Sequence, residues 1–129
     1  MTFTQEELDF MATQRLGRLA TVDPRGRVQN NPVGFFVDAK SGTIDIGGHG
    51  MGASKKFRNV RAGSTAALVI DELASVAPWT VRGIEIRGTA EALENQEPPL
   101  PGYSGEIIRI TPQKIVSWGL GVPSSNREV

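Results

Sequence analysis

Turn-forming residues divide this chain into short apolar stretches that are spaced for β-hairpins. Residues 23–26 read Asp-Pro-Arg-Gly, with proline and glycine at the second and fourth turn positions. Residues 40–42, Lys-Ser-Gly, predict a second turn. The stretches at 15–22 and 43–48 alternate apolar and polar residues, as half-buried strands do. This spacing favours an antiparallel sheet over a doubly wound fold of alternating strands and helices.

Two short helices accompany the predicted strands. Thr4 and Glu7 form the pattern of a capping box, and we expect a helix over residues 4–14. A glycine-rich segment at 47–52 opens into a second helix at 53–61. The remaining expected features are strands at 27–38, 65–71, 81–93, 105–110 and 115–119, an irregular loop at 94–102, a turn at 112–114 and an unstructured polar tail at 121–129. With 129 residues, this predicts a mainly β protein: one barrel domain over residues 1–129 with six or seven antiparallel strands.

Residue counts exclude several kinds of chemistry. The chain has no cysteine, which excludes disulfides, thiolate metal sites and cysteine nucleophiles. His49 is the single histidine, so a multi-histidine metal site is excluded and we expect no metal centre. No Gly-x-Ser-x-Gly elbow and no phosphate-binding Gly-x-x-x-x-Gly-Lys motif occurs. An enzyme with this composition needs a bound cofactor to supply its chemistry.

Charge and hydropathy also restrict the partners. Lysine plus arginine equals aspartate plus glutamate at 14 each, which gives no general attraction to nucleic acid or to an anionic membrane. No apolar run approaches the length of a membrane span, and the N-terminus lacks the order of charges typical of a signal peptide. We therefore expect a cytoplasmic protein.

Four cations lie within seven residues beside the glycine-rich segment: Lys55, Lys56, Arg58 and Arg61. Together with backbone N–H groups at a helix start and the Ser54 hydroxyl, they form the outline of an anion site. The alternative is the solvated face of an amphipathic helix.

A second unusual stretch, at 29–34, reads Gln-Asn-Asn-Pro-Val-Gly and interrupts a predicted strand. Amide side chains here suit the edge of a planar heterocycle, whereas a plain bulge with exposed polar residues is the alternative. Because Pro32 cannot donate to a sheet ladder, it predicts an edge strand, a bulge or a kink. Trp79 and Trp118 are candidates for the wall of a pocket or a subunit interface, or for ordinary core residues.

These stretches together resemble the split β-barrel flavin and deazaflavin oxidoreductases, the superfamily of pyridoxamine 5′-phosphate oxidase. Residues 18–27 are similar to the first hairpin of that family, and 31–35 to its second strand. Lys-Phe-Arg-Asn-Val at 56–60 resembles its phosphate-binding Lys-x-Arg-Asn-Leu helix, and 81–91 its long strand with a Gly-Thr-Ala signature. The resemblance covers most of the chain and implies an FMN-binding split barrel.

The short chain and the Lys56, Arg58 and Asn59 pattern resemble the actinobacterial branch that uses the deazaflavin coenzyme F-420. The resemblance implies that Ser54, Lys56 and Arg58 hold the phosphate of the coenzyme. The other cofactor-binding residues that it implies are Asn31, Pro32 and Val33 along the tricyclic ring, with Gly48, His49 and Asn59. It also implies a homodimer with sites at the interface, where Trp79 or Trp118 reaches the cofactor of the partner.

The expected reaction is hydride transfer between the deazaflavin and an unsaturated small molecule, and no catalytic side chain stands out. Residues 124–129 lack the Arg-x-His signature of the vitamin B6 oxidases, which disfavours that reaction. Two alternatives remain open. One is an FMN-dependent oxidase or reductase, and the other is a non-catalytic cofactor carrier or haem-binding module with His49 as its axial ligand.

Overall fold

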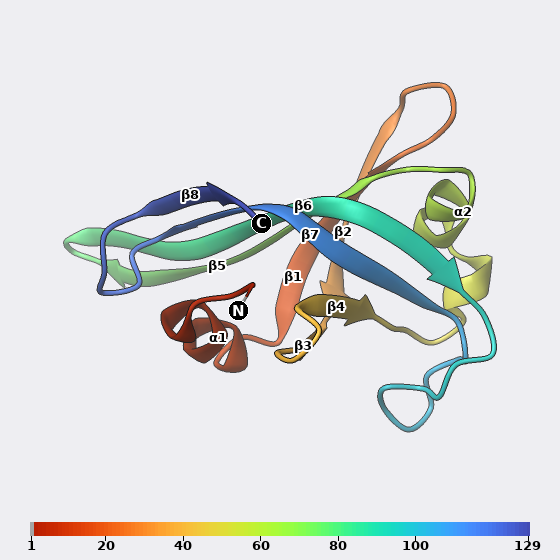
Figure 1. The fold of residues 1–129 in the computed structure, drawn as a ribbon, viewed down its shortest axis with the longest axis horizontal. Helices are drawn as coiled ribbons and strands as arrows, with labels where there is room; N and C mark the ends of the chain where they lie inside the picture. Colours follow the sequence, from red (N-terminus) through yellow and green to blue (C-terminus); the bar gives the residue numbers. More distant parts are fainter. Residues whose placement is uncertain (1) are drawn as a thin grey trace.

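The computed structural model describes residues 2–129 and contains one antiparallel sheet (Figure 1). Its elements are α1 (Gln5–Ala12), β1 (Leu16–Val22), β2 (Val28–Gly34), β3 (Phe36–Asp38), β4 (Thr43–Ile46), a 3-10 turn η1 (Met51–Ala53), α2 (Lys55–Arg61), β5 (Ala66–Val76), β6 (Trp79–Leu93), β7 (Ile107–Trp118) and β8 (Ser125–Glu128). The strand order is β2-β1-β5-β6-β7-β4-β3, and β8 pairs with β7. The predicted mainly β split barrel with two short helices is confirmed, and a short eighth strand adds to the seven along this path.

The core lies between one face of the sheet strands and the two helices. Branched side chains dominate it because the β-branched isoleucines pack well on a pleated surface. Its fully buried members include Leu19, Ile44, Ile46, Leu68, Ile70, Ile84, Ile86, Ile108, Ile110 and Ile115. Phe10 and Met11 add the buried face of α1, and Phe57 and Val60 add that of α2. No helix within residues 2–129 is long and apolar enough to cross a membrane.

The capping box at the start of α1 is confirmed. The Glu7 N–H donates to the Thr4 hydroxyl at 3.2 Å, and the Thr4 N–H donates to the Glu7 carboxylate at 2.9 Å. These two bonds satisfy donors that the first turn of a helix leaves free.

The predicted strand at 27–38 is divided at Phe35 into β2 and β3. These two strands stand at opposite ends of the sheet order, so the barrel is open beside β2. Pro32 lies on β2 opposite Arg18, and within residues 2–129 β2 pairs with β1 alone. Of the edge, bulge or kink predicted at Pro32, the structure shows the edge, which tolerates a residue without an N–H group.

The predicted turn at 112–114 is wrong. The structure has one continuous strand, β7, in place of the two strands expected at 105–110 and 115–119. The register opposite β6 shifts here, with Gly88 facing Pro112 and Arg87 facing Lys114, which leaves Gln113 as the extra residue of a β-bulge. A Cβ atom at Gly88 would collide with the carbonyl oxygen of Thr111, so a glycine lets the two strands approach at the bulge.

The expectation of an unstructured tail is also wrong. Ser125–Glu128 form β8 on β7, with Arg127 opposite Ile115. Arg127 also forms an ion pair with Glu7 at 2.7 Å, so a contact 120 residues away in sequence helps to order this strand.

Candidate functional site

The helix α2 begins with a complete cap. The Ser54 hydroxyl accepts a hydrogen bond from the Phe57 N–H at 3.3 Å and donates one to the Met51 carbonyl at 2.6 Å. The hydroxyl is therefore engaged in starting the helix. Because α2 has seven residues, its dipole is small, and side-chain charge is the main source of attraction for an anion here.

The glycine-rich segment before α2 is tied to the loop that precedes β7. The Met51 N–H donates to Ser104 Oγ at 2.9 Å, and the Gly52 N–H donates to the Glu106 carboxylate at 3.0 Å. The Ser104 N–H in turn donates to the Gly48 carbonyl at 2.9 Å. The two amides at residues 51 and 52 thus have protein acceptors, and the carboxylate of Glu106 occupies a position where sequence reasoning places an anion.

The four cations of α2 differ in their surroundings. Lys55 Nζ lies 3.7 Å from the Asp23 carboxylate, and Arg61 pairs with Glu94 at 2.5 Å. The exposed Arg58 donates to the Ala53 carbonyl at 3.0 Å, which does not neutralise its charge. The half-buried Lys56 has no ion-pair or side-chain hydrogen-bond partner within residues 2–129. Lys56 and Arg58 therefore hold the positive charge that carboxylates leave uncompensated.

Asp23, the partner of Lys55, stays ionised. Its carboxylate accepts hydrogen bonds from the backbone N–H groups of Arg27 and Arg25, both at 2.9 Å, and from the Arg27 side chain at 2.7 Å. These bonds, led by the one from the Arg27 backbone, lower the pKa of Asp23 to about 2. The negative charge of Asp23 pairs with Lys55. Lys56 is therefore the lysine of α2 that is available to a ligand.

Asn59 joins α2 to the barrel. Its side chain is 2% exposed, and its amide donates to the Thr21 hydroxyl on β1 at 3.1 Å and lies 3.5 Å from the Gln29 carbonyl on β2. We assign it the positioning of α2 against these strands.

The side chains of β2 alternate between two faces. Asn31 is half-buried and Val33 is 5% exposed, and both share a face with Gln29, which touches α2. Pro32 is exposed on the other face. The structure thus brings Asn31 and Val33, but not Pro32, onto the face of β2 that meets α2.

His49 lies on the glycine-rich segment and is exposed. Its Nδ1 is 2.8 Å from the Gly102 carbonyl, and its ring meets the Tyr103 ring edge-on, with 4.8 Å between centroids. These contacts hold the proline-containing loop against the segment before α2.

The start of β6 and the end of β7, which are Trp79 and Trp118, lie at the end of the sheet away from α2 (Figure 1). Trp79 starts β6 at the tip of the β5–β6 hairpin and is 70% exposed. Trp118 ends β7 and covers Gly83, where an added Cβ would lie 2.5 Å from the Trp118 ring. Within one chain, neither ring is brought to the predicted cofactor-binding residues.

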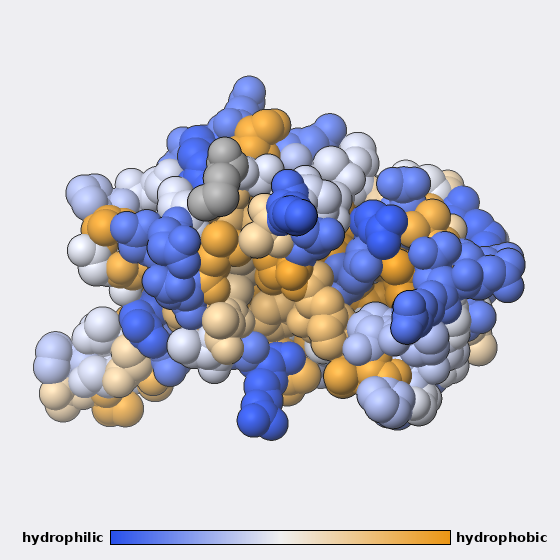
Figure 2. Space-filling view, turned by 60° about the horizontal axis from the view of Figure 1, so that its bottom comes forward, coloured by the Kyte–Doolittle hydropathy of each residue, from blue (hydrophilic) through white to orange (hydrophobic). Residues whose placement is uncertain are grey.

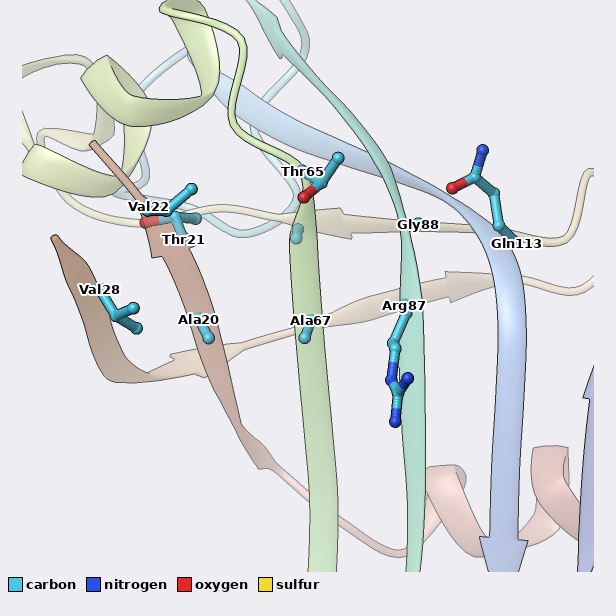
Figure 3. A pocket seen from close by; sticks show the side chains of 10 residues that line it. Ala20, Thr21, Val22, Val28, Thr65, Ala67, Arg87, Gly88 and Gln113 are labelled. Carbon is cyan, nitrogen blue, oxygen red and sulfur yellow. The ribbon is translucent and has the colours of Figure 1, made fainter. Parts of the chain in front are cut away.

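A hollow of about 300 Å³ lies on the outer side of the sheet (Figure 3). Ala20, Ala67 and Arg87 form one row across β1, β5 and β6 in its floor. Thr21, which accepts the hydrogen bond from Asn59, also lines it, so the hollow adjoins α2. Sequence reasoning missed this surface, although the small side chains of neighbouring strands were a signal for it.

Comparison with known proteins decides the family. The model of the pyridoxamine 5′-phosphate oxidase family matches residues 3–118. The chain belongs to this family. A member from Streptomyces rimosus, described as a 5a,11a-dehydrotetracycline/5a,11a-dehydrooxytetracycline reductase, is 44% identical over 121 residues, which are 93% of this chain and 85% of the relative. The predicted resemblance to a pyridoxamine 5′-phosphate oxidase-like split barrel is thus confirmed.

Solved structures with the same fold are distant in sequence. General stress protein 26 from Bacillus anthracis has a TM-score of 0.71 at 16% identity, and both chains are covered in full. A haem-binding protein from Mycobacterium smegmatis has a TM-score of 0.73 at 15% identity, covering 96% of this chain and 57% of that protein. At this level of identity the likeness concerns the fold alone, and one fold can carry different functions.

Proposed function

We propose that this chain is a reductase that uses a flavin-type cofactor, the deazaflavin coenzyme F-420, to reduce an unsaturated small molecule. The observation that carries the proposal is the 44% identity, over 93% of the chain, to a reductase of a dehydrotetracycline. FMN is the alternative cofactor, since the family as a whole is one of flavin-type enzymes.

The residues around α2 fit such a cofactor. Lys56 and Arg58 offer charge without a carboxylate partner, which suits a phosphate or another acidic group. Asn59 fixes the helix that carries them. We place the ring of the cofactor along Asn31 and Val33, with Gly48 and His49 at its end and Pro32 and Ser54 acting through the backbone they shape.

When bound, the reduced coenzyme supplies a hydride. The protein binds the coenzyme and the substrate and orients them toward each other. This raises the rate, because the reaction then takes place within one complex. Lys56 and Arg58 anchor one end of the cofactor, and the half-buried Asn31 presents an amide toward a ring edge.

We also propose that the protein acts as a homodimer with its sites near the subunit interface. The apolar tip of the β5–β6 hairpin supports this, because Val76 is 69% and Trp79 is 70% exposed. Neighbouring exposed apolar side chains of this size are typical of interaction surfaces. In the dimer, Trp79 or Trp118 would line the cofactor site of the partner.

The test is a titration of the purified protein with coenzyme F-420, FMN and haem. We expect quenching of the deazaflavin fluorescence, and oxidation of the reduced coenzyme when an enone or quinone is added. If the protein retains FMN but not coenzyme F-420, FMN is its cofactor. If it binds the reduced coenzyme without oxidising it, the protein is a carrier. A Soret band that His49→Ala abolishes would favour the haem-binding module. If none of the three is retained, the proposal fails.

A further inference from the structure

An aromatic hollow lies where the barrel is open. It has a volume of about 370 Å³, within the range of small-molecule sites. It lies between the start of β1, the end of β2 and the loop before β7. Besides Gln14 and Leu16, its lining residues are Arg15, Gly34, Phe35, Phe36, Leu100 and Tyr103. Figure 2, which brings the side of α1, β3 and β4 forward, shows hydrophobic surface recessed between hydrophilic projections on this face.

The hollow adjoins the proposed cofactor site. Gly34 follows Val33 directly, and a Cβ atom at Gly34 would lie 3.4 Å from the Tyr103 hydroxyl. The Tyr103 ring also contacts His49 and would lie 2.9 Å from a Cβ atom at Gly47. Tyr103 thus contacts both the end of β2 and the glycine-rich segment. A molecule in the hollow therefore lies beside these two segments.

The apolar walls suit a flat ring system. The Phe36 and Tyr103 rings meet edge to face, with 6.3 Å between centroids and 77° between planes. Leu100 is 44% exposed and adds an aliphatic side wall. Aromatic rings arranged in this way offer both faces and edges to a planar guest.

Two polar groups in the lining have no partner within residues 2–129. The Tyr103 hydroxyl makes no hydrogen bond there, and the exposed Arg15 guanidinium meets no carboxylate. A hydroxyl donates to a carbonyl oxygen, and a guanidinium binds an ionised oxygen. The Tyr103 hydroxyl and the Arg15 guanidinium together suit a ligand that carries a carbonyl close to an acidic enol or phenol.

We propose that this hollow binds the substrate of the proposed reductase, and that the substrate is a flat polycyclic carbonyl compound with an ionised oxygen. Arg15 binds the ionised oxygen, and Tyr103 binds the carbonyl and positions it. The inference rests on the proposed function for its link to reduction, but the binding itself needs no cofactor.

A second hollow, of about 440 Å³, shares Gln14, Phe35 and Phe36 with the first and provides the control. Its remaining lining includes Leu8, Val37 and Ala39, and none of the residues from 2–129 that line it is charged. It has no means to select an anion, so the two hollows predict different ligand preferences.

The probes are two naphthoquinones of equal ring size, one with an acidic enol (2-hydroxy-1,4-naphthoquinone) and one with a methyl group in its place (menadione). Their affinity is measured by calorimetry on the full chain without cofactor. We expect the enol to bind about tenfold more tightly. Arg15→Gln removes this preference and Arg15→Lys keeps part of it, whereas Tyr103→Phe weakens both probes by about threefold. Equal affinity for the two probes, or an equal loss of both in Arg15→Gln, would overturn the proposal.

Filling variants locate the probe. Leu100→Trp fills the aromatic hollow and should weaken both probes by at least tenfold, whereas Ala39→Trp fills the second hollow and should leave them unchanged. The reverse result contradicts the proposed location. Cofactor titration of Leu100→Trp separates the two proposals. If this variant binds the cofactor but not the probes, the substrate hollow is supported. If neither the parent protein nor any variant binds a cofactor, the proposed function is refuted instead.

Discussion

The buried carboxylate of Glu7 is held by both terminal nitrogens of Arg127, at 2.7 and 2.9 Å. Ser117 on β7 donates a third hydrogen bond to it at 2.7 Å. The Glu7 side chain is 1% exposed, so this pair is shielded from solvent on the carboxylate side. The Glu7 carboxylate therefore links α1 to β7 and to the C-terminal strand β8.

Glu7→Gln should destabilise the fold by about 3 kcal/mol, because removing one member of a buried pair leaves the other charge without its partner. Urea unfolding followed by tryptophan fluorescence measures the change. Glu6→Gln, an exposed neutral substitution in the same turn, is the matched control and should change the unfolding free energy little. An equal effect of the two variants would show that the pair contributes no net stability.

Acid should weaken the fold through Asp23. The folded chain holds the pKa of Asp23 at about 2, led by the hydrogen bond from the Arg27 backbone, against an ordinary 3.8. Because the pKa is lower in the folded state, the unfolded chain takes up the proton first. The contribution of ionised Asp23 to the stability of the fold is therefore complete above about pH 4 and is lost as the pH falls toward 2. We expect the difference in Tm between the parent and Asp23→Asn to shrink over that interval and to stay constant from pH 5 to 7.

Glu7 should add to this acid sensitivity. Burial alone would raise its pKa, but the hydrogen bonds from Arg127, Thr4 and Ser117 outweigh burial and lower the pKa below its ordinary value. The sign is the same as for Asp23, so the stability it supplies is present at neutral pH and lost in acid. The parent protein should lose more stability between pH 5 and 3 than Glu7→Gln does, and parallel curves would contradict this.

Lys56→Ala should weaken cofactor binding. Loss of a charged hydrogen bond to an acidic group costs about 1.5–3 kcal/mol, which corresponds to roughly ten- to a hundredfold in affinity. Lys40→Ala, at an exposed turn between β3 and β4, removes the same charge elsewhere and should have little effect. Titration of both variants with the coenzyme at low and high salt distinguishes a direct contact from a general change of charge.

Gly88→Ala should destabilise the protein strongly, because its methyl group would meet the Thr111 carbonyl across the bulge. We expect a loss of about 2 kcal/mol or more, since the neighbouring backbone has to shift. Gly48→Ala is the control, because its methyl group would meet only the end of Met51 at 3.8 Å. Urea midpoints of the two variants measure the difference, and similar midpoints would mean that β7 moves freely at the bulge.

Local sequence signals predicted most of the fold. The capping box at Thr4, the turn at 23–26 and the edge position of Pro32 all depend on residues close together in the chain, and all are confirmed. The failures at Pro112 and at Ser125–Glu128 have another cause. A bulge depends on the glycine of the opposite strand, and β8 depends on Glu7, so neither can be found by reading its own segment.

The same limit applies to the candidate site. The cations of α2 were visible in the sequence, but their distribution between carboxylate-bound and free was not, because Asp23 and Glu94 are distant in the chain. Tyr103 was missed for a similar reason. It stands in a loop of proline and glycine residues, and only its packing against His49 and Phe36 brings it to the open side of the barrel.

Trp79→Ser should weaken self-association. The side chain is 70% exposed beside Val76 at the end of a hairpin that extends past the core, so in a monomer its large apolar area faces water. Burying such an aromatic in a dimer provides binding energy that serine cannot replace. Sedimentation at several concentrations should show a dimer for the parent and a dissociation constant at least tenfold higher for the variant. The exposed Leu16, 61% accessible at the start of β1, gives the control Leu16→Ser, which should leave the association unchanged. A parent protein that is monomeric at all concentrations would refute the dimer.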